Sequence, residues 1–149
     1  MEKKILSSNK KAYYNYDIFE KLETGVILSG YEVKSLKQSK VSLVDSIVKF
    51  SNGEAFIENM SIAPYEHIST HIIDYDSKKK RKLLMHKSEI TKIHAKVREK
   101  GFTIIPLEIY IGLRCKIKIL VGLAKGKKVY DKREAIKKRD ITREIARGY

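Results

Sequence analysis

The chain has 149 residues, of which 42% are hydrophobic, and its formal net charge at pH 7 is +14. This length fits one domain with an appendage, and the apolar fraction is large enough to form a core. So high a positive charge indicates a polyanionic partner, either nucleic acid or an anionic membrane, and argues against an ordinary neutral enzyme.

The nucleic acid is the better candidate of the two. No apolar run approaches the roughly 20 residues of a membrane-spanning helix, and the N-terminus carries lysines without the apolar segment of a signal peptide. The single cysteine, Cys115, excludes an internal disulfide. We therefore expect a cytoplasmic protein without a membrane partner.

Alternating apolar and polar residues predict strands in the first third of the chain. Residues 1–8 are expected to form a flexible extension, and a strand is predicted from Tyr13, with Tyr14, Tyr16 and Ile18 on one face. A second alternating segment spans residues 26–37, where Gly30 suggests a bulge or a sharp bend.

Two hairpins and one helix are predicted in the rest. Asn52-Gly53 separates two apolar runs and suits a type I′ turn, which needs positive φ at both positions. A second hairpin is predicted from residues 103–111 and 115–123, with Lys116 and Lys118 on the polar face of its second strand. Between the hairpins, Ser88 is a plausible N-cap of a helix that ends before Gly101.

This arrangement predicts a mainly β fold, a small oligonucleotide-binding (OB)-like β-barrel over residues 9–124 with one or more short helices. A basic tail follows over residues 125–149, with ten Lys/Arg against four Asp/Glu. Its apolar residues are sparse, which predicts a segment disordered alone and helical on RNA. The alternative is a solvated helix that packs on the barrel through its isoleucines.

Two basic stretches suggest contact with RNA. Five consecutive cations, from Lys78 to Lys82, are typical of a segment that binds phosphates, although a solvated loop would also explain them. Near the N-terminus, Lys10 and Lys11 precede tyrosines, including Tyr16, so that lysines reach phosphates while an aromatic ring stacks on a base. We expect at least one of these tyrosines to be in the core instead.

The sequence gives little support for a catalytic or metal-binding site. His67 and His71 are four residues apart, but no cysteine or carboxylate cluster completes a site. An RNA nuclease would need such a cluster, and only these two histidines with Asp74 and Asp76 approach one. We therefore predict no catalytic residue, no metal and no cofactor.

Several long motifs occur in order along the chain: NKKAYYNY, GYEVKSLK, RKLLMHKSEI, KGFTIIPLEIY and GLAKGKKVYDKRE. Through them, about residues 9–147 resemble the SsrA-binding protein family, also called small protein B. The resemblance implies an OB-like barrel that binds the tRNA-like domain of transfer-messenger RNA. It also implies a role in trans-translation, the rescue of stalled 70S ribosomes, with the protein and the RNA together mimicking a tRNA.

The resemblance also implies roles for individual residues. Glu23 matches the RNA-facing acid of the family, Leu84 its RNA-binding leucine, and His86 the position two residues further on, while Tyr16 matches a stacking aromatic. The phosphate contacts that it implies are Lys10, Lys34, Arg81, Lys82, Lys125, Lys127 and Lys128.

In the tail, the resemblance places Tyr130 at a stacking position and matches Asp131, Lys132 and Arg133 to a family motif. The tail is then expected to enter the mRNA path near the decoding region of the small subunit. The alternative to this function is a generic ribosome- or single-strand-RNA-binding OB-fold protein, which would not select a folded tRNA-like elbow. We expect a monomer in either case.

Overall fold

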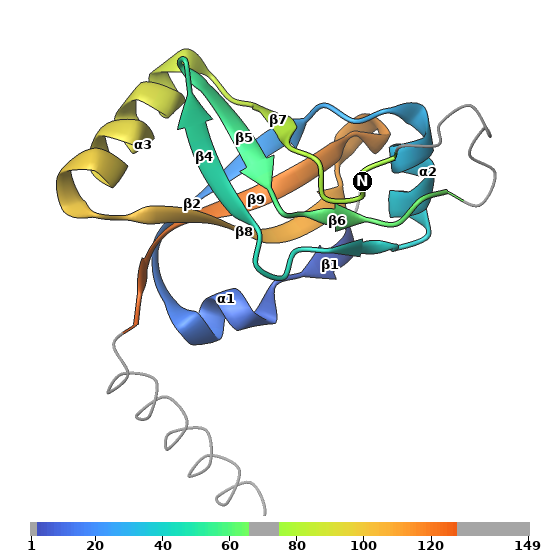
Figure 1. The fold of residues 1–149 in the computed structure, drawn as a ribbon, viewed down its shortest axis with the longest axis horizontal. Helices are drawn as coiled ribbons and strands as arrows, with labels where there is room; N and C mark the ends of the chain where they lie inside the picture. Colours follow the sequence, from blue (N-terminus) through green and yellow to red (C-terminus); the bar gives the residue numbers. More distant parts are fainter. Residues whose placement is uncertain (1–2, 66–74, 128–149) are drawn as a thin grey trace, which may run out of the picture.

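The structure is a computed structural model that describes residues 3–65 and 75–127. It contains nine strands, three α-helices and one 3₁₀ turn within those residues (Figure 1). The strands are β1 (Lys4–Ser8), β2 (Tyr16–Val26), β3 (Val41–Ser42), β4 (Ile47–Ser51), β5 (Glu54–Glu58), β6 (Ser61–Ile62), β7 (Arg81–Leu84), β8 (Thr103–Ile111) and β9 (Ile117–Gly126). The helices are α1 (Lys10–Asn15), α2 (Gly30–Lys37) and α3 (Lys87–Lys100), with the 3₁₀ turn at Leu113–Cys115.

Seven strands form one sheet that curls back on itself. Their order is β1-β8-β4-β5-β7-β2-β9, and β9 pairs in turn with β8. The circuit from β8 through β4, β5, β7, β2 and β9 therefore returns to its first strand, and its weakest link is a single β4–β8 residue pair, Val48 with Ile104. This architecture confirms the predicted mainly β, OB-like fold with short helices.

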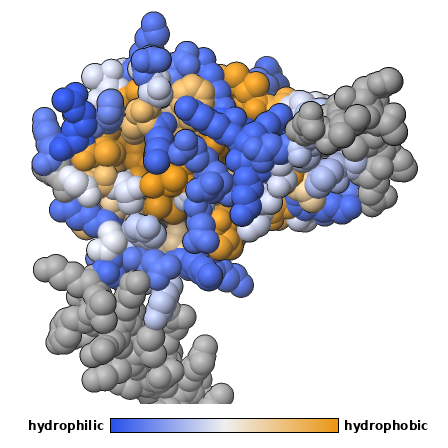
Figure 2. Space-filling view, in the orientation of Figure 1, coloured by the Kyte–Doolittle hydropathy of each residue, from blue (hydrophilic) through white to orange (hydrophobic). Residues whose placement is uncertain are grey.

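The core lies inside this circuit. Alternate residues of neighbouring strands point inward, and the fully buried ones include Ile57, Leu83, Ile109 and Ile119. Figure 2 shows the outer surface on one side of the molecule, where hydrophilic side chains cover most of the face and apolar ones form a few patches.

Both predicted hairpins are present. β4 and β5 are joined by Asn52 and Gly53, whose φ angles of 52° and 76° are those that a type I′ turn requires. β8 and β9 form the second hairpin and pair from Thr103 with Ala124 to Ile111 with Ile117.

The N-terminal prediction is wrong for residues 4–8. These residues form β1, which pairs antiparallel with β8 and buries Leu6 in the core. The segment is short and mostly polar, so its order depends on an edge of β8 that is distant in sequence.

The chain enters β2 at Tyr16 and not at Tyr13, because residues 10–15 form α1. Asn9 caps this helix: its Oδ1 accepts from the Ala12 amide at 3.3 Å, and its Nδ2 donates to the carbonyls of Leu43 and Pro106. Ala12 packs against an outer apolar cluster that includes Leu107. The half-buried Tyr16 packs against that cluster, and none of Tyr13, Tyr14 and Tyr16 is buried in the core, contrary to the expectation for this segment.

The second alternating segment is also helical, where a strand was predicted. Ser29 precedes α2, and the Glu32 carboxylate accepts from the Ser29 amide at 3.1 Å and from its hydroxyl at 2.9 Å. This capping by the Glu32 carboxylate favours a helix start over an extended strand. Gly30 is therefore the first residue of α2 and not a bend within a strand.

The predicted third helix exists but begins earlier. His86, and not Ser88, is the N-cap of α3, and its amide donates to Glu89 Oε1 at 3.2 Å. The helix ends as predicted at Gly101, whose φ of 66° is left-handed.

Candidate nucleic-acid interface

The register of five strands sets one row of residues across the outer face of the sheet. Directly paired residues of antiparallel strands point to the same face. From β1 through β8, β9 and β2 to β7, the paired residues are Ile5, Tyr110, Lys118, Gly25 and Leu84. We call this set the cross-strand row.

Gly25, Leu84 and Lys118 of this row line a hollow in the surface. An added Cβ on Gly25 would lie 3.2 Å from Leu84 Cβ, so this leucine borders the hollow directly. Leu84 is 53% exposed although it is apolar. The result is a patch of apolar surface next to the ammonium group of Lys118, a combination that suits a nucleobase and its phosphate.

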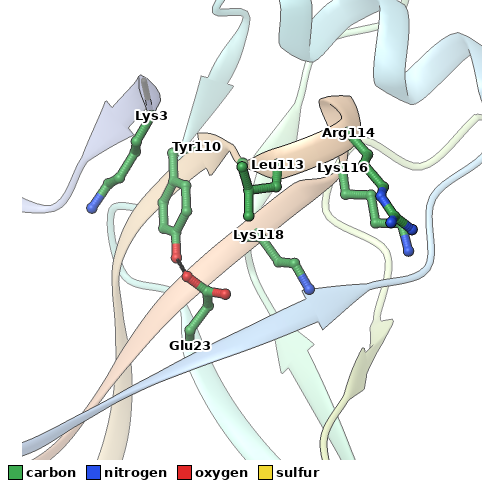
Figure 3. A pocket seen from close by; sticks show the side chains of 8 residues that line it. Lys3, Glu23, Tyr110, Leu113, Arg114, Lys116 and Lys118 are labelled. Atoms are coloured by element: carbon green, nitrogen blue, oxygen red, sulfur yellow. Dashed lines mark hydrogen bonds between the residues drawn. The ribbon is translucent and has the colours of Figure 1, made fainter. Parts of the chain in front are cut away.

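A second row of paired residues on the same face includes the acid Glu23. Glu108, Leu120 and Glu23 are paired across β8, β9 and β2, two residues along from the first row. The hydroxyl of Tyr110 crosses β9 to donate a hydrogen bond to Glu23 Oε2 (Figure 3). Burial and this bond to the Glu23 carboxylate raise the pKa of Tyr110, so its hydroxyl stays protonated.

Cations surround this acid. Lys3 Nζ lies 4.2 Å from the centre of the Tyr110 ring and 3.0 Å from Glu108 Oε2. On the other side, Arg114, Lys116 and Lys118 line a second hollow together with Glu23 and Tyr110, and this hollow shares Lys118 with the one beside Gly25. Figure 3 shows Lys118 between the Tyr110–Glu23 pair and the side chains of Arg114 and Lys116. Within residues 3–65 and 75–127, the side chains of Arg114, Lys116 and Lys118 form no ion pair.

The turn between β8 and β9 places Arg114. Arg114 and Cys115 have φ angles of 60° and 57°, the left-handed conformation that non-glycine residues adopt at a cost of about 1–3 kcal/mol. The Lys116 amide closes the turn on the Leu113 carbonyl at 3.3 Å. Leu113, 69% exposed, is thereby held at the rim of the hollow.

Three of the predicted RNA-binding residues come together on this face. Glu23, Leu84 and His86 line one hollow of about 440 Å³ together with Lys118. They come from β2, from β7 and from the N-cap of α3, and are adjacent because β2 pairs with β7. The structure therefore groups residues that are up to sixty-three positions apart in sequence.

A second predicted group lies at the opposite end of β2 and β9. It surrounds α1 and the point where the chain leaves β9, and consists of Lys10, Lys11, Tyr16, Lys125 and Lys127. Lys127 is held there by its amide, which donates to the Asn15 carbonyl at 2.9 Å, and by Nζ, which donates to the Tyr13 carbonyl at 3.3 Å. Tyr16 and Glu23 are seven residues apart on β2, or roughly 23 Å at the rise of an extended strand.

Two further lysines are exposed elsewhere. Lys34 lies on α2, next to Val33, which lines the hollow beside Leu84, and its Nζ is 5.4 Å from the centre of the Tyr65 ring. Lys82 on β7 forms a surface ion pair with Glu54 at 3.0 Å. Such a pair is weak and can open for a phosphate.

Arg81 was predicted to contact phosphate, but the structure places its side chain inside the protein. Its side chain is 1% exposed, and Nε lies 2.7 Å from Glu32 Oε2. The rest of its guanidinium donates to the carbonyls of Met60, Ser77 and Lys79. Every direction of the group is thus used inside the protein, and Arg81 joins β7 to α2 instead of facing RNA.

The buried partner of Arg81 is ionised. Burial by itself opposes the charge of Glu32, but hydrogen bonds from Ser29 and Arg81, together with the Arg81 charge, lower the pKa of Glu32 below its usual value. Lys79 adds a second cation at 3.4 Å from Glu32 Oε1.

Sequence reasoning missed five residues of the face: Lys3, Tyr110, Arg114, Lys116 and Lys118. The alternation of residues 115–123 already set Lys116 and Lys118 on a polar face, which was an available signal. Tyr110 and Arg114 had no such signal, because their roles depend on pairing with β2 and on the backbone of the turn.

Some predicted residues lie outside the described part of the chain: His67, His71, Asp74, Lys128, Tyr130, Asp131, Lys132 and Arg133. Asp76, within it, is exposed and accepts from the Lys78 amide. The described residues hold no group of three His, Cys, Asp or Glu side chains suited to a metal. None of their helices is long and apolar enough to cross a membrane.

Known proteins resemble the chain over almost its whole length. A family model described as SmpB protein matches residues 6–149. Relatives named SsrA-binding protein include one from Persephonella marina, 52% identical and aligned over 98% of this chain and 94% of the relative. Another from Coprothermobacter proteolyticus is 51% identical and aligned over 97% of this chain and 95% of the relative.

A solved structure described as "tmRNA-SmpB: a journey to the center of the bacterial ribosome" contains a chain of the same fold. It aligns with a TM-score of 0.69 and 44% identity, over 87% of this chain and 93% of that chain.

Proposed function

The chain belongs to the SmpB protein family, and we propose on this basis that it binds SsrA RNA, the transfer-messenger RNA, and acts with it on the bacterial ribosome. The complex serves trans-translation: the RNA is delivered to stalled ribosomes, and the incomplete peptide is tagged. The observation that supports this function best is the full-length match to SsrA-binding proteins together with a cationic, partly apolar face on a barrel-like sheet.

The chemistry of the face suits a folded RNA better than a regular duplex. The major groove of an RNA helix is too narrow for side chains to read, so proteins recognise RNA by shape, phosphates and exposed bases. Lys118, Arg114 and Lys116 supply phosphate contacts, and Leu84 supplies an apolar surface for a base or sugar. Glu23 accepts hydrogen bonds from base N–H groups. We propose that the tRNA-like domain of the RNA binds to this face.

The second group, around α1, extends the surface along β2. Lys10, Lys11 and Lys127 are positioned for phosphates further along the RNA, and the exposed Lys125 lies 4.7 Å from the centre of the Phe102 ring. Tyr16 is half-buried in the outer apolar cluster, so only part of its ring is available to stack. Lys34 and Lys82 complete the proposed contacts on the side of α2 and β7.

Residues 125–149 are proposed to act on the ribosome, in the mRNA path near the decoding region. Their charge, ten cations against four acids, suits a path lined by rRNA. Tyr130 is proposed to stack there, next to Asp131, Lys132 and Arg133. The function is binding without a catalytic step, and we place it in the cytoplasm, where ribosomes translate.

A titration at two salt concentrations tests the proposed function. It compares the tRNA-like domain of transfer-messenger RNA with an ordinary tRNA of equal length. A preference for the former that persists at the higher salt is expected, because shape-specific contacts do not depend on counterion release. Equal binding that collapses with salt would favour the alternative, a generic RNA-binding OB-fold protein.

A truncation after Gly126 tests whether the barrel binds the RNA while the tail acts on the ribosome. The shortened protein is expected to keep most of its affinity for the RNA and to lose peptide tagging in a reconstituted translation assay. Normal tagging by the truncated protein would contradict a ribosomal role for the tail.

A further inference from the structure

The hollow beside Glu23 has an unusual mixture of groups for a surface that binds phosphates. It measures about 390 Å³, and its lining combines one carboxylate, one tyrosine hydroxyl and one exposed leucine with several cations. A phosphate alone would be held better without Glu23, because two anions repel. The ligand of this hollow must therefore present hydrogen-bond donors to the carboxylate and negative charge to the cations.

The carboxylate is oriented for such a ligand. Tyr110 donates to Oε2 of Glu23, which fixes the plane of the group and leaves Oε1 and one lone pair of Oε2 for a ligand. Glu23 is itself exposed. An ionised carboxylate accepts hydrogen bonds only, so it selects for adjacent N–H donors and against adjacent acceptors.

Among the four bases, one fits this requirement on its Watson–Crick edge. Guanine presents N1–H and N2–H side by side, whereas adenine and cytosine present one amino group next to a ring-nitrogen acceptor, and uracil presents one N–H between two carbonyls. A paired guanine uses this edge for its own partner, so the base must be unpaired and turned out of its stack, as sequence-specific RNA recognition generally requires.

We propose that the hollow formed by Glu23, Tyr110, Leu113, Arg114 and Lys118 binds one unpaired guanine of the RNA through its N1–H and N2–H groups. This inference rests on the proposed function for the identity of the RNA. Leu113 at the rim contacts the face of the base, and Arg114 and Lys118 bind its O6 or the flanking phosphates. The left-handed backbone at Arg114 and Cys115 keeps this rim in place.

Inosine tests the proposal in the intact complex, because it differs from guanosine only by the missing N2 amino group. Each unpaired guanine of the tRNA-like domain is replaced in turn, and affinity is measured with the wild-type protein and with Glu23→Gln. At one position we expect about a tenfold loss with the wild type, the size of one hydrogen bond to a charged group. With Glu23→Gln, the same replacement should cost less than about threefold. Glu99→Gln, an exposed acid on α3, is the matched control and should keep the full loss.

A titration with mononucleotides tests the hollow without the RNA. Guanosine 5′-monophosphate should shift the NMR amide signals of Leu113, Arg114 and Lys118 at lower concentration than inosine or adenosine 5′-monophosphate, which carry the same phosphate. Equal binding of the three nucleotides would mean that the hollow recognises only phosphate and would overturn the proposal.

The two proposals fail differently. Tight, selective binding of the unmodified RNA without any inosine-sensitive position overturns the guanine site and leaves the proposed function intact. An inosine effect that persists unchanged in Glu23→Gln also overturns the assignment to this hollow. Lack of selective binding to the unmodified RNA overturns the proposed function, and the mononucleotides then decide the guanine site alone.

Discussion

The Tyr110 hydroxyl on β8 donates to the Glu23 carboxylate on β2, across the intervening strand β9. The two residues are 87 positions apart in sequence. This bond explains how an acid is kept within a cationic surface: the tyrosine satisfies one oxygen and sets the direction of the other. The face is thus prepared for hydrogen-bond donors and not for phosphate alone.

Tyr110→Phe removes the donor and keeps the ring, which Lys3 covers. We expect the affinity for the tRNA-like domain to fall about three- to tenfold, because Glu23 then loses its orientation, and the free energy of unfolding to fall by about 1 kcal/mol. Binding titrations and urea unfolding measure the two effects. Tyr31→Phe on α2, where the ring packs against Tyr75, is the control. Unchanged affinity in Tyr110→Phe would contradict the positioning role.

Lys118→Ala should weaken the salt dependence of binding. Each phosphate contact contributes roughly 0.7–0.9 to the slope of log affinity against log salt concentration, so removing this side chain should lower the slope by about that amount. Lys49→Ala is the matched control, because Lys49 is ion-paired with Glu58 on β5. Equal slopes for Lys118→Ala and the wild type would remove Lys118 from the interface.

Arg81→Met should affect stability and not RNA contacts. It leaves the Glu32 carboxylate buried without its main partner, which costs about 3–5 kcal/mol of the free energy of unfolding. The neighbouring exposed Lys82→Met, which removes only a surface pair, should cost less than about 1 kcal/mol. Urea unfolding gives both values.

The Arg81 prediction has two further checks. Combining Arg81→Met with Glu32→Gln should recover part of the loss, because no buried charge remains. The salt slope of RNA binding by the folded Arg81→Met variant should equal that of the wild type, and a reduced slope would mean that Arg81 reaches phosphate after all.

The Glu32 carboxylate should make stability sensitive to acid. Its pKa is lowered in the folded protein, so its contribution is complete above the usual glutamate pKa of about 4.3 and is lost as the pH falls below that value toward the folded pKa. The difference in Tm between the wild type and Glu32→Gln should therefore be largest near neutral pH and shrink below about pH 4. A constant difference over that range would contradict ionisation of the buried group.

Gly25→Ala tests the hollow in the cross-strand row. The new methyl group would lie 3.2 Å from Leu84 Cβ and would displace the Leu84 side chain at the edge of the hollow that both residues line. We expect RNA affinity to fall at least fivefold, with a loss of stability below about 2 kcal/mol, as is usual for slight overpacking. Gly30→Ala, which has nothing within 4 Å of the added Cβ, is the control and should bind normally. Normal binding by Gly25→Ala would show that the hollow stays empty in the complex.

Features encoded within a few residues were predictable from the sequence. The left-handed turn at Asn52-Gly53 and the helix end at Gly101 depend on the conformational freedom of those residues, and the strands of the last hairpin follow from their alternation. The resemblance to a known family also indicated Glu23, Leu84 and His86, which the structure places around one hollow. Two helices do not follow from alternation, because the residues near Tyr14 and Tyr31 alternate as in a strand although Asn9 and Ser29 cap helices in the structure.

The tertiary structure alone decided which charged residues are available to a ligand. Arg81 and Lys82 are neighbours in a run of five cations, yet one is buried against Glu32 and the other lies at the surface, because successive residues of a strand point to opposite faces. The order of β1 and the contact between Tyr110 and Glu23 likewise depend on strand pairing over long separations. By itself, the sequence determined the local turns, the excess of positive charge and the class of partner, because these depend on residue type and close neighbours. The position of each charge relative to the core depends on which strands pair and in which register.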